Sequence, residues 1–133
     1  MSAAPTISLA GKKILLVDDD PDILFSLEAA FEPTGATIEK AKNGNDAVDL
    51  AAKNPPDLLI LDLMLPGRSG FLVLEKLKKR KPTDKPAVIM ITGNSGSRHK
   101  MFADTYGVNE YFTKPVKMDR LVEAANRLLA PTA

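Results

Sequence analysis

The sequence predicts an α/β fold in which a doubly wound parallel sheet of five strands lies between two layers of helices. Three observations support this prediction. Short apolar runs without polar alternation recur along the chain, and such runs are typical of strands buried on both faces. Segments with helical spacing of apolar residues lie between them. Turn residues separate the two kinds of segment, so strand and helix alternate five times, a pattern that places helices on both faces of a parallel sheet.

Length and composition are those of one ordinary domain. The chain has 133 residues, which is enough to bury a core without disulfides or structural metals. We assign residues 11–130 to the domain, residues 1–10 to a flexible leader and residues 131–133 to a tail. The leader lacks the basic and apolar regions of a secretory signal, and no apolar run approaches the roughly 20 residues that span a bilayer. We therefore expect a cytoplasmic protein.

Charge and cysteine content exclude several classes of function. The 18 Lys and Arg residues nearly balance the 17 Asp and Glu residues, so no overall field favours nucleic acid or a membrane as a direct partner. Cys is absent, which excludes disulfides, thiolate metal sites and Cys nucleophiles. The single histidine, His99, cannot build a zinc site. The function must therefore be read from local clusters of residues.

The first strand and helix are clearly marked. Residues 14–17 form an apolar run. Asp20 suits a helix N-cap, Pro21 suits the first helical position, and Pro33 with Gly35 should end the helix. The predicted buried face of this helix carries Ile23, Leu24, Leu27 and Phe31.

The middle of the chain repeats this alternation. A helix is predicted at 45–53, before Pro55 and Pro56, followed by a strand at 58–61. A helix at about 69–80 ends in the cationic run KLKKRK, which favours a helix C-terminus. The predicted buried positions are Ala47, Val48 and Ala51 in the first of these helices, and Leu72 or Val73, Leu74 and Leu77 in the second.

The last part of the chain completes the sheet. A strand at 88–91 precedes a poorly patterned helix at about 97–106, and a helix at 118–129 closes the domain. The strands at 37–41 and 110–113 are more polar than the others, which favours the two edges of the sheet. The last helix should bury Leu121, Val122, Ala125, Leu128 and Leu129.

Polar side chains stand where the predicted strands end. Three aspartates, residues 18–20, follow the first strand, Asp62 ends the third, Thr92 ends the fourth, and Lys114 follows the fifth. Ligands of doubly wound folds bind beyond the carboxyl ends of the strands. We therefore expect these side chains to form one site.

The chemistry of this set points to a divalent cation and a phosphoryl group. Adjacent negative charges about 4 Å apart repel by roughly 4 kcal/mol at an effective dielectric of about 20. A hard cation such as Mg²⁺, which prefers carboxylate oxygens, would offset that repulsion. Thr92 can donate a hydrogen bond to a phosphoryl oxygen, and Lys114 can neutralise another. Aspartate itself is a competent phosphoryl acceptor.

Each of these residues also has an ordinary structural interpretation. Asp20 can be a helix cap, Asp62 can begin a turn, Thr92 can be a strand end, and Lys114 can be a solvated charge. Independent turn residues, however, have no reason to fall at four strand ends on one edge of a sheet. Their joint occurrence favours a site.

The stretches ILLVDDDPDI, PDLLILDLMLPGRSG, VIMITG and YFTKP stand in this order along the chain. In sequence and spacing they resemble the receiver domain of two-component response regulators, from about residue 12 to residue 129. Pro66 and Gly70 follow Asp62 at the spacing of that family's phosphorylation loop. The resemblance implies a flavodoxin-like three-layer sandwich with strand order 2-1-3-4-5.

The resemblance also implies roles for the site residues. Asp62 corresponds to the phosphoacceptor, and Asp18 with Asp19 corresponds to the metal-binding acidic pair. The ion would be Mg²⁺, with Mn²⁺ as a substitute, and Asp62 and the backbone carbonyl of Met64 would complete the protein ligands. Asp20 keeps its capping role. No organic cofactor is expected.

Three further residues match the family's signalling positions. Thr92 resembles the switch hydroxyl, Lys114 the phosphate-contacting lysine, and Tyr111 the aromatic residue whose burial accompanies activation. Without the resemblance, Tyr111 is nearly as well explained as an amphipathic residue of an edge strand.

The function implied is that of a phosphoacceptor in a two-component phosphorelay. A histidine kinase or phosphotransfer protein would supply the phosphoryl group, and the chain would catalyse only its own phosphorylation and dephosphorylation. A downstream protein would bind the face built from the fourth helix, the fifth strand and the fifth helix. Candidate contact residues on that face are Met101, Phe102, Tyr106 and Tyr111. We expect no output domain on this chain.

Rival interpretations fit less well. An aspartate-nucleophile phosphatase would need an Asp-x-Asp arrangement followed by Thr or Val, whereas Pro21 and Asp22 follow the triplet here. A flavin or dinucleotide module would need a glycine- or hydroxyl-rich loop, because three aspartates repel phosphate. An unphosphorylated receiver used for docking stays open. So do a natural single-domain regulator, a relay intermediate and a piece of a hybrid protein.

Overall fold

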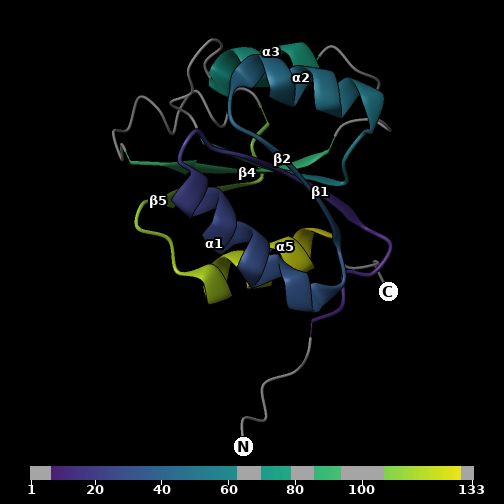
Figure 1. The fold of residues 1–133 in the computed structure, drawn as a ribbon, viewed down its shortest axis with the longest axis vertical. Helices are drawn as coiled ribbons and strands as arrows, with labels where there is room; N and C mark the ends of the chain where they lie inside the picture. The colour runs from purple at the N-terminus through teal and green to yellow at the C-terminus, as the bar shows by residue number, and fades with distance from the viewer. Residues whose placement is uncertain (1–6, 63–69, 79–85, 94–106, 130–133) are drawn as a thin grey trace, which may run out of the picture.

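Five parallel strands form one sheet in the order β2-β1-β3-β4-β5, and helices cover both of its faces (Figure 1). The computed structural model describes residues 7–62, 70–78, 86–93 and 107–129. The order predicted from the resemblance is confirmed. The strands are β1 (Lys13–Val17), β2 (Thr37–Ala41), β3 (Leu58–Asp62), β4 (Ala87–Thr92) and β5 (Glu110–Thr113).

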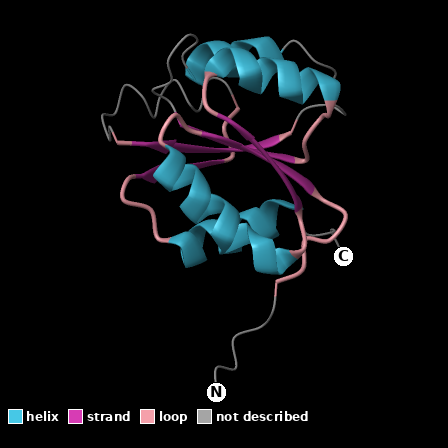
Figure 2. Cartoon of the chain, in the orientation of Figure 1, coloured by secondary structure: helices cyan, strands magenta, loops and turns pink. Residues whose placement is uncertain are grey.

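The helices form one layer on each side of the sheet. Figure 2 shows α1 and α5 on one face and α2 and α3 on the other. The bounds are α1 (Pro21–Phe31), α2 (Gly44–Lys53), α3 (Gly70–Lys78) and α5 (Met118–Leu129), and a short 3-10 helix, η1 (Glu32–Thr34), follows α1. The helix predicted at about 97–106 lies outside the described residues. Among the described helices, none is long and apolar enough to cross a membrane.

The start and end of α1 follow the sequence signals. The Asp20 carboxylate accepts a hydrogen bond from the Asp22 N–H at 2.9 Å, and Pro21 occupies the first turn. Gly35 ends η1 with φ of 82°, a left-handed conformation that glycine adopts without steric cost. The predicted cap and the predicted end of this segment are both confirmed.

The structure differs from the prediction, or completes it, in one detail of α2 and one of α3. The cap of α2 is Asn43, whose side chain accepts from the Asp46 N–H at 2.8 Å, so the helix begins one residue earlier than predicted. In α3, Val73 is buried, whereas Leu72 is 48% exposed. The choice between Leu72 and Val73 therefore resolves in favour of Val73, because Leu74 and Leu77 share its face.

The sheet is buried on both faces by two separate apolar clusters. Alternation along β1 divides its side chains between them: Ile14 and Leu16 join the cluster beneath α1 and α5, and Leu15 and Val17 join the cluster beneath α2 and α3. The more polar strands β2 and β5 form the two edges, as predicted. The central strands therefore have rigid surroundings up to their carboxyl ends.

The segment before β1 packs onto the first of these clusters. Leu9 is 3% exposed, and its N–H donates to the Thr34 carbonyl at 2.7 Å. Ile7 packs against the same cluster. The expected flexible leader through residue 10 is thus wrong for residues 7–10, because the alternation of Ile7 and Leu9 gives the segment an apolar side. Residues 1–6 lie outside the described part of the chain.

Truncation of Leu9 measures this packing. We expect Leu9→Ala to lower the free energy of unfolding by about 2–4 kcal/mol, because the buried isopropyl group of the side chain is lost and a cavity remains. The neighbouring exposed Ser8 provides the matched control, and Ser8→Ala should stay within about 0.5 kcal/mol of wild type. Urea titration gives both values. Equal midpoints for the two variants would mean that this segment does not contribute to the core.

Candidate functional site

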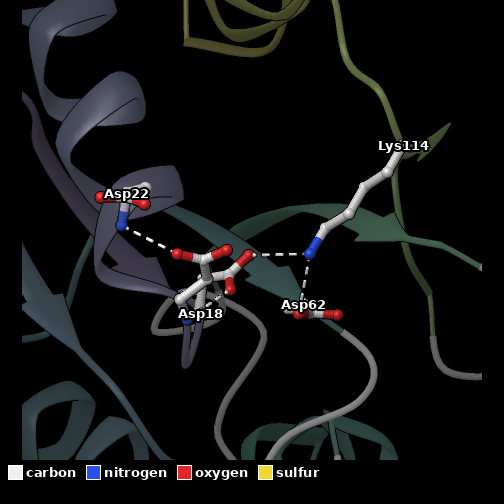
Figure 3. A network of polar contacts seen from close by, with 5 residues as sticks. Asp18, Asp22, Asp62 and Lys114 are labelled. Carbon is white, nitrogen blue, oxygen red and sulfur yellow. Dashed lines mark hydrogen bonds and ion pairs between the residues drawn. The ribbon is translucent and has the colours of Figure 1, made fainter.

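Strand order brings the predicted site residues to one edge of the sheet. Asp18 follows β1, Asp62 ends β3, Thr92 ends β4, and Lys114 follows β5. Strand β1 pairs with β3, β3 with β4, and β4 with β5, and all of these pairs are parallel. The carboxyl ends of the four strands therefore lie side by side at the same edge of the sheet. Figure 3 shows Asp18, Asp62 and Lys114 pointing toward one another from three different strands.

The Lys114 ammonium group bridges two buried carboxylates. Its Nζ lies 3.1 Å from Asp18 Oδ2 and 3.1 Å from Asp62 Oδ2 (Figure 3). Asp18 is 1% exposed and Asp62 is 5% exposed, so water screens neither charge well. The other carboxylate oxygen of Asp18 accepts the Asp20 N–H at 2.9 Å. The site is therefore held by one cation shared between two anions.

Burial and hydrogen bonding have opposite effects on the pKa of Asp18. Burial raises the pKa of the Asp18 carboxyl, the nearby Asp62 charge raises it further, and the hydrogen bonds from Asp20 and Lys114 only partly lower it. At Lys114, burial lowers the pKa of the ammonium group, but its contacts with Asp62 and Asp18 outweigh burial and raise it. Lys114 thus stays charged, while the pKa of the Asp18 carboxyl stays above its ordinary value despite the contact with Lys114.

The same edge offers oxygen ligands for a cation. Asp18, Asp19 and Asp62 each present one carboxylate oxygen, and these three atoms lie within 4.8 Å of one another. Asp19 is exposed, so one side of the group faces solvent. Carboxylate oxygens with room for water suit Mg²⁺, and the residues present therefore fit the ion implied by the sequence. Met64, whose carbonyl was predicted as a further ligand, lies outside the described residues.

Strands β4 and β5 hold the remaining site residues. Thr92 is fully buried, and its carbonyl accepts the Lys114 N–H at 2.8 Å, which ties the ends of the two strands together. The Lys114–Pro115 peptide bond is cis. Tyr111 pairs with Met90 and packs partly buried against the cluster beneath α2 and α3, and this burial raises the pKa of its hydroxyl.

The sequence brought the right residues together but missed one of their contacts. Asp18, Asp19, Asp62, Thr92 and Lys114 were predicted to share one edge, and the structure places them there. Lys114 was expected to serve a phosphoryl group, whereas it bridges Asp18 and Asp62. The sequence held a signal for this contact. Two carboxylates buried on neighbouring strands need a positive charge nearby even before a metal binds, and Lys114 is the cation predicted at the same edge.

Comparisons with known proteins find the same kind of domain. A family model described as the response regulator receiver domain matches residues 14–126. Protein PilH of Pseudomonas aeruginosa is 36% identical over 118 residues, which cover 89% of this chain and 98% of PilH.

Solved structures agree with this match. A CheY-like response regulator receiver domain protein from Methanospirillum hungatei JF-1 superposes with a TM-score of 0.83 at 31% identity, covering 89% of this chain and 93% of that chain. The receiver domain of a signal transduction histidine kinase from Syntrophus aciditrophicus gives a TM-score of 0.81 at 31% identity, covering 90% and 91%. The likeness therefore extends over nearly the whole domain.

Burial and the nearby Asp62 charge disfavour the ionised form of Asp18. We therefore expect removal of this charge to raise the free energy of unfolding by an amount that depends on pH. A raised pKa means that the native state holds this proton more tightly than the unfolded state, so the contribution of Asp18 to stability falls as the pH rises from its ordinary pKa of 3.8 through the raised value. Without divalent cations, Asp18→Asn should therefore raise the urea midpoint at neutral pH, despite losing the contact with Lys114.

The difference between Asp18→Asn and wild type should widen from acid to neutral pH and then level off. Asp49→Asn, at an exposed position of α2, is the matched control and should leave the midpoint nearly unchanged at each pH. A lower midpoint for Asp18→Asn, or a gap that does not vary with pH, would contradict this account of the site.

Proposed function

The chain belongs to the response regulator receiver domain family, and on that premise we propose that it accepts a phosphoryl group on Asp62 in a two-component phosphorelay. The observation that carries the proposal is the bridge from Lys114 to Asp18 and Asp62, beside the exposed Asp19. This arrangement collects negative charge around one carboxylate and supplies a cation next to it. A purely structural ion pair would not need the third carboxylate.

In the proposed reaction the Asp62 carboxylate is the nucleophile. One of its oxygens attacks the phosphorus atom of a phosphohistidine on a partner protein, a bond forms between that oxygen and phosphorus, and the phosphorus–nitrogen bond breaks. The electron pair stays on the imidazole nitrogen, which then takes a proton. Asp62 ends a strand whose five residues are all buried, so its carboxylate is held in place for attack.

Two kinds of positive charge support this step. Lys114 lies beside the Asp62 carboxylate and can neutralise an oxygen of the incoming phosphoryl group. Asp18, Asp19 and Asp62 would hold Mg²⁺, or Mn²⁺ in its place. When bound, the ion offsets repulsion between the carboxylates and the phosphoryl oxygens.

The switch would act through Thr92, Lys114 and Tyr111. Phosphorylation adds negative charge at Asp62, which favours a hydrogen bond from the Thr92 hydroxyl and draws the Lys114 ammonium group away from Asp18. Because the Lys114 N–H is bonded to the Thr92 carbonyl, the ends of β4 and β5 would respond together. Tyr111, on β5, would then carry the change toward a downstream protein.

The output face proposed from the sequence comprises the fourth helix, β5 and α5. Of its candidate contact residues, Tyr111 is described, whereas Met101, Phe102 and Tyr106 lie outside the described residues. We further propose that the chain catalyses only its own phosphorylation and dephosphorylation. Its cytoplasmic location stays a prediction.

Labelling with a small phosphodonor tests the central step. In the presence of Mg²⁺ and acetyl phosphate, we expect wild type to gain one phosphoryl group by intact mass, in a form that hydroxylamine removes. Asp62→Asn should gain none, because the amide is not a nucleophile of this kind. Asp49→Asn, which changes an exposed aspartate of α2, should be labelled like wild type. An unmodified wild type, or equal labelling of Asp62→Asn, would refute the proposal.

Stabilisation by Mg²⁺ tests the ion site without using phosphorylation. An ion that binds only the folded chain adds about 2.7 kcal/mol to the free energy of unfolding at 100 times its dissociation constant. We expect Mg²⁺ to raise the urea midpoint of wild type, and Asp19→Asn to remove most of this response. Because loss of the Asp19 charge relieves repulsion with Asp18 and Asp62, the metal-free midpoint of Asp19→Asn should not fall below that of wild type. An unchanged response in Asp19→Asn would exclude it as a ligand.

A further inference from the structure

An open groove runs along α5, in the layer of helices that α5 shares with α1 (Figure 2). Its volume is about 1070 Å³. The wall opposite α5 is built from the segment before β1, the end of α1 and η1, with the lining residues Ile7, Ser8, Ala30, Pro33 and Thr34. Asp18, Asp62 and Lys114 do not line this groove, so the carboxylate site does not account for it.

Helix α5 presents two rows of side chains to the groove. Within each row the residues are four positions apart, so each row follows one face of the helix. Met118, Val122 and Asn126 form the first row, and Asp119, Glu123 and Arg127 form the second. Met118 and Val122 pack partly buried against the cluster beneath α1 and α5, whereas the second row is exposed. The apolar floor of the groove is therefore bordered by a charged row.

The charged row changes sign along the helix. It is negative at Asp119 and Glu123 and positive at Arg127. Among the described residues, neither Asp119 nor Glu123 takes part in an ion pair. Arg127 lies 3.7 Å from Glu110, but both side chains are exposed, and such a pair contributes little to stability. All three charges are thus available for contacts outside the chain.

A second copy of α5 has the charge order that complements this row. When two such helices pack antiparallel about a twofold axis at Glu123, Asp119 of each copy faces Arg127 of the other, because both positions are four residues from Glu123. Two opposite-charge contacts then form together. The long aliphatic stem of Arg127 would cover the apolar floor of the other copy while its guanidinium group stays at the rim.

We propose that this groove is the interface of a homodimer, in which α5 packs antiparallel against α5 of a second copy of the chain. The inference does not depend on phosphorylation, because it concerns the unmodified chain. It assigns attraction to the two contacts between Asp119 and Arg127. It also places the two Glu123 carboxylates near each other at the axis, where their repulsion opposes association and keeps the dimer reversible.

Charge reversal tests this interface. The dissociation constant of the dimer is measured by sedimentation equilibrium of the full, unphosphorylated chain from micromolar to millimolar concentrations. Asp119→Lys and Arg127→Glu should each raise it about tenfold or more, because each turns two attractive contacts into repulsive ones. The double variant restores opposite charges in reversed order and should return to within about threefold of wild type. Glu75→Lys, a matched reversal at an exposed position of α3, should stay within about twofold.

Salt and the central glutamate give two further readouts of the same contacts. Added NaCl should weaken the wild-type dimer and strengthen that of Arg127→Glu, because screening reduces attraction in the first and repulsion in the second. Glu123→Gln should tighten the dimer about twofold or more, since it removes the repulsion at the axis.

The stability of each variant is checked by its urea midpoint at a concentration where all variants are monomeric. Asp119 lies in the first turn of α5, where a positive charge opposes the helix dipole. Asp119→Asn is therefore the milder second variant, and it should raise the dissociation constant less than Asp119→Lys does.

Three outcomes would overturn the proposal. The first is a wild-type chain that stays monomeric at millimolar concentration. The second is a dimer whose dissociation constant is the same in wild type, Asp119→Asn and Arg127→Glu, because its interface would then lie on another face. The third is a double variant that associates no better than the single reversals, which would exclude the contact between Asp119 and Arg127.

Discussion

The Lys114 bridge between Asp18 and Asp62 is the interaction on which the site depends. Each carboxylate lies at the end of a strand that is buried between helices, and the two strands are neighbours, so their charges cannot separate. A single ammonium group from β5, the edge strand, reaches both at 3.1 Å. Without it, two buried carboxylates would face each other with no positive charge between them, which disfavours the ionised form of both. The raised pKa of Asp18 indicates that even this contact does not remove the conflict.

Burial of the two apolar clusters offsets the energetic cost of such a site. Burial of a single Leu or Ile side chain stabilises a protein by about 1.5–3 kcal/mol, and both faces of the central strands are covered in this way. The strands are therefore well packed up to the point where the site begins, and each of Asp18, Asp62, Thr92 and Lys114 lies at the last position of a strand or directly after it. The cation and the phosphoryl group proposed above would then act on a charge imbalance that the fold already holds in place.

The sequence predicted most of this because the strongest signals are local. Asp20 with Pro21 determines the start of α1, and apolar runs determine the central strands, so these elements agreed with the structure. Contacts between segments far apart in the sequence could not be predicted from these local signals. The Leu9 N–H donates to the Thr34 carbonyl, 25 residues further along the chain, and the bridge from Lys114 to Asp18 joins positions 96 residues apart. No periodicity encodes such contacts, since they arise only after the strand order is set.

Alternation along β5 separates the two sides of the proposed signalling path. Tyr111 packs against the cluster beneath α2 and α3, whereas its neighbour Phe112 packs against the cluster beneath α1 and α5. The two neighbouring side chains thus connect this edge strand to both apolar clusters. Lys114 follows directly after the same strand, and its ammonium group contacts both buried carboxylates. A phosphoryl group on Asp62 that draws this ammonium group away from Asp18, as proposed above, would therefore act at the end of a strand whose side chains reach both apolar clusters.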